Sequence, residues 1–309
     1  MLIQITTSNA GGRLDGFLKR HFDAEGLEVT RSQITNAING GRITLNGEIV
    51  KAGRILRKGD QIDGDLYGSD APAEPEEIPL NIVYEDEYLL IINKPRGMVV
   101  HPGAGVRSGT LLNGLLWHLK KFGDNSLERA GIVHRLDKNT SGLMVVAKNA
   151  KVQATLAKMF EYHDVKRTYH GLVEGRIDQS GTVNKNIIRH PGVRTLYTTT
   201  DRAGEGRTAI THYKPLAVYK TQSNKVITLV EFKLETGRTH QIRVHMKSLN
   251  RPLVGDPEYN PASSLKASGQ LLEAIRLEFT HPITGKAMNS SVEYSDEFSH
   301  TLKKLSKMS

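Results

Sequence analysis

Strand-like apolar runs, interrupted by helical segments at irregular intervals, constrain the fold of this chain most strongly. Short apolar runs at 82–84 and 88–92 precede two segments with helical periodicity, at 110–120 and 149–162. Strand-like runs then dominate, and they lie at 169–173, 209–213, 226–234 and 274–279. Because these runs do not alternate regularly with helices, the pattern favours an α+β fold over a doubly wound parallel sheet.

The first 68 residues are expected to form a small unit of their own. Two helices are predicted, one over 14–22 and one that follows the cap residue Thr30, and Gly40-Gly41 ends the second. A hairpin is predicted over 43–50 around the turn Asn46-Gly47. One acidic and six basic residues lie between positions 31 and 58, the basic ones being Arg31, Arg42, Lys51, Arg54, Arg57 and Lys58.

Residues 69–79 are acidic, rich in proline and almost free of large apolar side chains. Such a composition cannot bury a core of its own. We therefore predict an extended linker over 69–79, between a small domain of residues 1–68 and a larger domain of residues 80–309.

The net charge of +9 is distributed unevenly along the chain. Residues 1–68 hold nine basic and eight acidic side chains, whereas residues 69–88 hold seven acidic and no basic ones. The remaining residues hold 33 basic against 18 acidic side chains. Such an excess suits a polyanionic partner such as a nucleic acid, although a generally basic, solvated surface would have the same composition.

Several classes of protein are disfavoured by what the sequence lacks. There is no cysteine, which excludes disulfides and thiolate metal sites, and no histidine pair has the helical spacing of a metal site. A dinucleotide-binding loop would need a glycine where Ser108 stands, and no G-x-S-x-G elbow is present. No signal peptide is visible, and no apolar run approaches the roughly 18 residues that span a bilayer. We expect a monomeric cytoplasmic protein without metal, cofactor or membrane contact.

A single acid, Asp137, lies between the basic pair His134-Arg135 and a Thr-Ser-Gly turn that ends at Gly142. A cation within a few ångströms stabilises an ionised carboxylate, so Arg135 is expected to keep Asp137 charged. A fixed, ionised aspartate can serve as a nucleophile, as a general base, or simply as one half of an ion pair.

A second polar segment holds two arginines, one glutamine and two histidines within eight positions. Alternation along a strand would place Arg238 and His240 on one face and Gln241 and Arg243 on the other. Such side chains are costly to bury without partners, so they suit an anionic ligand or an ion pair with Asp137.

Together, these segments resemble the motifs of the RluA/RluD-type pseudouridine synthases. The string His-Arg-Leu-Asp-x-x-Thr-Ser-Gly stands at 134–142, and Thr-Gly-Arg-x-His-Gln-x-Arg-x-His stands at 236–245. The Lys-x-Tyr strand of the family is matched at 166–169, and shorter motifs are matched at 93–97, 101–103 and 255–259. The resemblance covers residues 1–285 and is closest to the RluD branch, since the first unit also resembles an S4 RNA-binding domain. The sequence departs from the family motifs at a few positions, for example at Asn139, where aspartate is common. None of these departures removes Asp137, Tyr169 or Arg243.

The resemblance implies an enzyme that isomerises uridine in RNA to pseudouridine. The N1–C1′ bond is broken, the uracil turns and the base is rejoined through C5, so nothing is oxidised and no cofactor is needed. Asp137 is implied as the catalytic residue, and both attack at C1′ and abstraction of a ribose proton remain open. Arg243 is implied to pair with that carboxylate and Tyr169 to stack on the target base, while Arg135 would enter the RNA and hold the flipped state.

Further RNA contacts are expected from basic residues in both domains, namely His134, Arg238, His240, Arg31, Arg42, Lys51 and Arg54. The expected fold is an S4-like domain followed by a larger mixed, mainly antiparallel sheet. The expected substrate is structured RNA, above all the 23S RNA of the large ribosomal subunit. A synthase of the same family that acts on tRNA, and a non-catalytic RNA-binding factor in ribosome assembly, are the alternatives.

Overall fold

The computed structural model describes residues 2–6, 10–25, 29–64, 73–103, 106, 108–120, 127–193, 195–202 and 204–308. The chain divides into two units. The first comprises Met1–Ala73 with Pro102–Arg107, and the second comprises Glu74–His101 with Ser108–Ser309. Residues 69–72 of the expected linker lie outside the described residues, and the boundaries drawn at 68 and 79 remain predictions.

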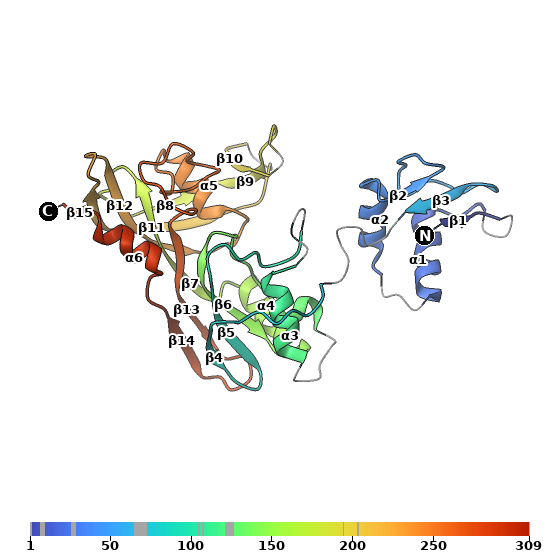
Figure 1. Ribbon diagram of the computed structural model, residues 1–309, viewed down its shortest axis with the longest axis horizontal. Helices are drawn as coiled ribbons and strands as arrows, with labels where there is room; N and C mark the ends of the chain where they lie inside the picture. Colours follow the sequence, from blue (N-terminus) through green and yellow to red (C-terminus); the bar gives the residue numbers. More distant parts are fainter. Residues whose placement is uncertain are drawn as a thin grey trace. The chain divides into compact units, whose positions relative to one another are not determined.

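The first unit packs two helices on a small antiparallel sheet (Figure 1). The sheet has the order β1 (Leu2–Gln4), β3 (Gln61–Gly64), β2 (Ile43–Leu45), and the helices are α1 (Leu14–Ala24) and α2 (Arg31–Asn39). The predicted cap is confirmed, because Thr30 and Gln33 form a reciprocal capping box at the start of α2. Both helices predicted for this unit are confirmed, because α1 covers positions 14–22 and α2 follows Thr30.

The predicted hairpin in this unit is only partly correct. Asn46 and Gly47 do form a tight turn, with φ angles of 55° and 80°. However, Ile49 and the residue after it form no strand, and β2 pairs with β3 instead. The reason is that Asn46 exchanges hydrogen bonds with Gln61, which places β3 along the edge of β2.

The second unit is built on a ten-stranded, mixed sheet that is mainly antiparallel (Figure 1). Its order is β15 (Ser306–Lys307), β11 (Ile210–Lys220), β12 (Val226–Leu234), β7 (Lys166–Glu174), β13 (Leu272–Thr280), β6 (Ser141–Ala147), β5 (Leu89–Lys94), β4 (Ile82–Glu85). In addition, β14 (Ala287–Ser291) pairs with β13 and β8 (Gly181–Asn184) pairs with β11, while β9 (Asn186–Arg189) and β10 (Tyr197–Thr200) form a separate ribbon. Only β6 and β13 pair in parallel among these strands, so the expected α+β class is confirmed.

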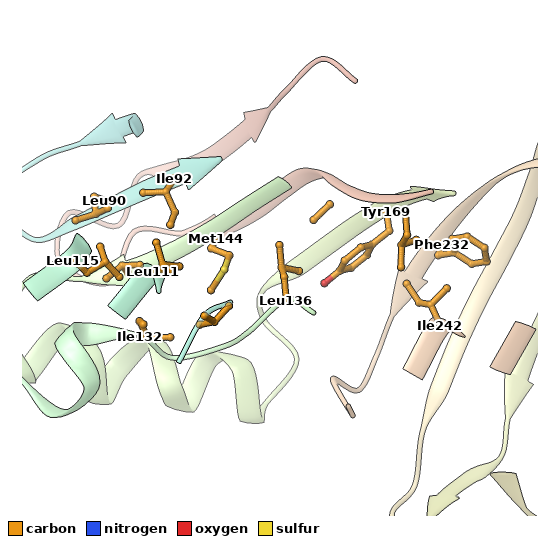
Figure 2. Packing of buried hydrophobic residues seen from close by; sticks show 14 of the residues in the cluster. Leu90, Ile92, Leu111, Leu115, Ile132, Leu136, Met144, Tyr169, Phe232 and Ile242 are labelled. Atoms are coloured by element: carbon orange, nitrogen blue, oxygen red, sulfur yellow. The ribbon is translucent and has the colours of Figure 1, made fainter. Parts of the chain in front are cut away.

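Helices cover both faces of the β5–β6 part of the sheet. Leu90 and Ile92 of β5 pack with α3 (Leu111–Leu119), and Figure 2 shows them with Leu111 and Leu115. Residues that alternate with them, such as Leu89 and Ile91, pack on the other face with α4 (Ala150–Glu161). All seven residues of β6 are buried as a result, which explains why its sequence is apolar rather than alternating. The helices predicted over 110–120 and 149–162 are confirmed.

A further helix, α6 (Asp296–Lys303), was not predicted. It begins at the cap residue Ser295 and buries Phe298 against the β7–β12 part of the sheet. Within the described part of the chain, no helix is long and apolar enough to cross a membrane.

The loop that carries Asp137 enters the sheet at a position where only glycine fits. It follows the 3-10 turn η3 (Glu128–Gly131), and Leu136 anchors it in the core (Figure 2). Gly142, at the start of β6, has a φ of 117°, and a Cβ there would lie 2.2 Å from the carbonyl oxygen of Ala274 on β13. The close parallel pairing of β6 with β13 therefore fixes the path of the chain just after Asp137.

The strand alternation considered for positions 238–245 is wrong, because Gln241–Ser248 form the helix α5. The Oε1 atom of Gln241 accepts hydrogen bonds from Arg238 N and Thr236 Oγ1, which closes the turn before the helix. Gln241 and His245 then both contact the Oγ1 atom of Thr211 on β11, as residues four apart on a helix can. Because these polar side chains find hydrogen-bond partners, they can be buried on a helix. Their alternation in the sequence therefore does not indicate a strand.

Candidate active site

Asp137 lies beside Arg243, as the resemblance implied. The Nη1 atom of Arg243 is 3.2 Å from Asp137 Oδ2, and the Nε2 atom of His240 is 4.0 Å from Asp137 Oδ1. Arg135, by contrast, is exposed, so the cation against the carboxylate comes from α5 and not from the neighbouring sequence. The side chain of Asp137 is 18% exposed and lines a cavity of about 880 Å³.

Arg243 contacts three carboxylates. Its Nε and Nη2 atoms donate to both oxygens of Asp256, at 2.7 and 2.8 Å, and Nη2 also lies 2.5 Å from Glu258 Oε2. Burial alone would lower the pKa of Arg243, but hydrogen bonds to Asp256 and the nearby charges outweigh it and raise the pKa. The guanidinium is thereby held permanently charged and fixed, with Nη1 directed to Asp137.

Asp256 is itself fixed by the backbone. It is fully buried, and its Oδ1 atom accepts hydrogen bonds from the backbone N–H groups of Glu258 and Tyr259 at 3.0 and 3.1 Å. The ring of Tyr259 also lies under the guanidinium of Arg243, with 4.9 Å between Cζ and the ring centroid. The sequence reasoning matched the motif at 255–259 but gave Asp256 no role, since spacing alone did not show which base it would meet.

His240 connects Asp137 to a pair of tyrosines. Its Nδ1 atom is 2.9 Å from Tyr259 Oη, which also accepts a hydrogen bond from Tyr197 N. Burial lowers the pKa of His240, and the charge of Arg243 adds to this, although Asp137 opposes it. His240 also has a φ of 57°, a conformation that costs free energy outside glycine and that the surrounding contacts maintain. The expected RNA contact of His240 remains a prediction, while its place beside Asp137 is a new observation.

Tyr169 lies on β7 and shares the wall of the cavity with Asp137. It is 5% exposed and belongs to the same core cluster as Leu136 and Ile242 (Figure 2). Burial raises the pKa of Tyr169, so its hydroxyl stays protonated at neutral pH. The ring can therefore offer an uncharged aromatic surface close to the carboxylate.

Lys94 fixes the other side of the Asp137 loop and was not predicted. It is fully buried, and its Nζ atom donates to the backbone oxygens of Pro95, Met98 and Lys138 at 2.9, 2.9 and 3.1 Å. Burial lowers the pKa of Lys94 to about 7, although the charge of Asp137 raises it. These bonds tie the turn after β5 to the residue that follows Asp137.

The other predicted RNA-contact residues divide between the two units. His134, Arg135 and Arg238 line the cavity, with Arg135 and Arg238 exposed. In the first unit, three of the predicted residues are exposed and one is half-buried, these being Arg31, Lys51, Arg54 and, half-buried, Arg42. Their roles remain predictions.

The cavity has further lining residues that the sequence reasoning missed. Arg167 lies two positions before Tyr169 on β7, so strand alternation places both on one face. The spacing in the sequence therefore indicates Arg167, and not the neighbouring Lys166, which is exposed. Phe160 of α4 packs against the core and also lines the cavity, where it stacks on His134 with 4.5 Å between ring centroids.

The arrangement can support chemistry on a nucleotide. A cavity of this size matches sites that enclose drug-sized ligands, and it combines one held carboxylate with a neutral aromatic ring and a basic rim. Among the described residues, no group of three or more His, Asp or Glu side chains could hold a metal ion. The carboxylates around α5 converge on Arg243 instead.

Comparison with protein families gives two matches. The family model for RNA pseudouridylate synthase matches residues 88–248, and the model for the S4 domain matches residues 13–62. The first match includes Asp137, Tyr169 and Arg243, and the second falls within the first structural unit.

Curated relatives match over nearly the whole chain. The "Ribosomal large subunit pseudouridine synthase D" of Xanthomonas campestris pv. campestris is 38% identical and aligns with 97% of this chain and 91% of its own. The "Uncharacterized RNA pseudouridine synthase YlyB" of Bacillus subtilis is 40% identical, over 99% of this chain and 98% of its own. Among solved structures, "Human RNA Pseudouridylate Synthase Domain Containing 1" aligns with 75% of this chain and 90% of that chain, with a TM-score of 0.59 and 24% identity, a likeness of fold.

Proposed function

The chain belongs to the RNA pseudouridylate synthase family, and on that basis we propose that it converts uridines of large-subunit ribosomal RNA to pseudouridine through Asp137. Membership makes the protein an isomerase that acts on RNA. The choice of ribosomal RNA is supported by the names of the relatives and by the S4 match.

The position of Asp137 carries the proposed mechanism. The reaction needs a group that acts on the ribose at C1′ or C2′ while the N1–C1′ bond breaks. Asp137 lies in the cavity wall, and Arg243 engages its Oδ2 atom at 3.2 Å. That contact orients the carboxylate, and both the nucleophilic route and the proton-abstraction route require a carboxylate in a fixed position.

The target uridine must leave its stack to reach this carboxylate. Unstacking costs a few kcal/mol, and stacking of the base on an aromatic side chain returns about 1–3 kcal/mol. Tyr169 is the aromatic residue that shares the cavity wall with Asp137, and its neighbours hold it in one orientation. Arg135 is exposed at the same cavity and is free to enter the RNA helix from which the base has left.

The experiment that tests this function is pseudouridine mapping on defined RNAs. We expect the purified protein to modify specific uridines in a large-subunit ribosomal RNA transcript from its source organism, and none in a tRNA pool from the same source. Modification confined to the tRNA pool would establish the alternative substrate class. Absence of pseudouridine from both RNAs would contradict the proposed function.

The first unit is proposed to bind the RNA through its basic edge. Removing three exposed charges by Arg31→Gln, Lys51→Gln and Arg54→Gln together should weaken RNA binding. It should also make the dependence of log Kd on log salt shallower by roughly 2–3 units, because each lost phosphate contact releases about one counterion fewer. Binding titrations between about 50 and 200 mM salt measure this.

A matched control removes the same charge elsewhere. Lys286→Gln, Lys303→Gln and Lys304→Gln together change exposed lysines of the second unit, so the net charge falls equally. We expect this control to keep the wild-type salt slope. Equal slopes for both triple variants would show that only net charge matters and that the edge has no specific role.

A further inference from the structure

The cavity beside Asp137 has a strongly basic lining. Four arginines line it, and they face two acids, Asp137 and Glu161; the arginines are Arg135, Arg167, Arg207 and Arg238. Three of these arginines are exposed, as expected for side chains that approach RNA from solvent. Arg167 is the exception, because it is only 9% exposed.

Arg167 is a buried cation without an anion. Within the described part of the chain, it makes no ion pair and donates no hydrogen bond, and its Nε atom is inaccessible and has no acceptor. Its Cζ atom lies 5.3 Å from the ring centroid of Phe160, a cation–π contact that stabilises the guanidinium without neutralising it. A buried charge normally requires a partner, since desolvation is costly.

His134 lines the same cavity, and it has a second donor without a partner. The backbone N–H of Val145 donates to His134 Nε2 at 3.0 Å, so that nitrogen must carry a lone pair. Burial lowers the pKa of His134 to about 3, and the charge of Arg167 contributes, so the ring is neutral and its hydrogen lies on Nδ1. This buried Nδ1–H has no acceptor among the described residues.

Both donor groups contact the ring of Phe160. The ring of His134 stacks on that of Phe160, with 4.5 Å between the ring centroids and 26° between the planes. The guanidinium of Arg167 also lies over the Phe160 ring. Gly237 confines Arg167 from the other direction, because a Cβ there would lie 2.8 Å from Arg167 Nη1. Both donors are thus held rigidly before any ligand arrives.

We propose that Arg167 and His134 form a binding site for a phosphodiester group of the RNA, next to the target uridine. The ligand is an anion with several acceptor oxygens, which a guanidinium and a neighbouring N–H can bind together. Arg167 and Tyr169 project from the same face of β7, roughly 7 Å apart along the strand. The bound phosphate therefore belongs to the target nucleotide or to its immediate neighbour, and it positions that nucleotide toward Asp137.

This inference rests on the proposed function. A phosphate-binding role and a purely structural role for Arg167 predict opposite changes in the melting temperature when Arg167 is replaced. Arg167→Met keeps an unbranched apolar side chain, although a shorter one, and removes an uncompensated buried charge together with its cation–π contact with Phe160. The melting temperature of the free protein should therefore stay equal or rise. A residue that served only the fold would lower the melting temperature when replaced.

RNA binding provides the second readout. With a large-subunit ribosomal RNA transcript, Arg167→Met should raise the Kd roughly 10- to 100-fold, as expected for a charge-assisted hydrogen bond. The salt slope should become shallower by about 0.7–0.9, the contribution of one phosphate. Arg167→Lys should recover part of the affinity. Gly237→Ala, which keeps the charge but displaces Nη1, should also weaken binding.

The matched control is Arg176→Met, which removes an exposed arginine that is paired with Asp178 outside the cavity. It should leave both the Kd and the salt slope near the wild-type values. An unchanged salt slope in Arg167→Met, or a fall in melting temperature with unchanged affinity, would overturn the phosphate site. Failure of the wild-type protein to form pseudouridine would instead contradict the proposed function, and binding and turnover are measured separately for that reason.

Discussion

Replacing Arg243 by methionine is expected to cut the rate of pseudouridine formation by roughly 10²-fold or more at neutral pH. Nη1 of Arg243 holds Asp137 at 3.2 Å, and no other arginine or lysine among the described residues makes an ion pair with that carboxylate. Without this cation, Asp137 would lose the contact that fixes its orientation in the cavity.

The same substitution should also destabilise the fold. It leaves the buried Asp256 and the nearby Glu258 without their cation, and removal of one partner from a buried ion pair costs about 3–5 kcal/mol. Arg243→Lys should do better in both respects, although one ammonium group cannot reproduce the two-pronged contact with Asp256. Circular dichroism and thermal melting establish whether each variant is folded before its rate is measured.

Single-turnover rates at saturating RNA check this account. If Arg243 merely contacted phosphate, both variants would weaken RNA binding and leave the rate at saturating RNA in place. An unchanged saturating rate in a folded Arg243→Met protein would therefore rule out a catalytic ion pair with Asp137.

The sequence predicted most of the elements because their periodicity is strong. The helices at 110–120 and 149–162 have apolar stripes, and both begin at a residue whose side chain caps the helix. The long strands were also predicted, since runs such as 226–234 are too apolar and β-branched for a surface loop. Local preference and tertiary packing agree in these segments.

The site was harder to predict because its contacts join distant positions. Asp256 lies 13 residues beyond Arg243 and Asp137 lies 106 residues before it, and only the folded chain shows that both meet one guanidinium. The α5 segment was interpreted through the alternation that a strand would give its polar residues, but it forms a helix. Their partners, such as Thr211 on β11, come from elsewhere in the fold. The resemblance to a family supplied the pair Asp137–Arg243, which periodicity could not.

Replacing Asp137 by asparagine is expected to have the largest effect of any single change, lowering the isomerisation rate by about 10⁴-fold or more. Asparagine keeps the size of the side chain and can still accept a hydrogen bond from Arg243, but it is neither a nucleophile nor a base at neutral pH. The pairing of Arg243 with Asp256 and Glu258 remains, so the fold should be preserved. RNA affinity should also stay close to that of the wild-type protein.

Tritium release tests the central claim most directly. Formation of the C5–C1′ bond displaces the hydrogen on C5, so RNA that contains 5-tritiated uridine releases tritium to water once for each pseudouridine formed. With excess enzyme and a large-subunit ribosomal RNA transcript, we predict release by the wild-type protein. Asp137→Asn protein that binds the same RNA equally well should release none. Appreciable single-turnover release by Asp137→Asn would contradict the role assigned to this carboxylate.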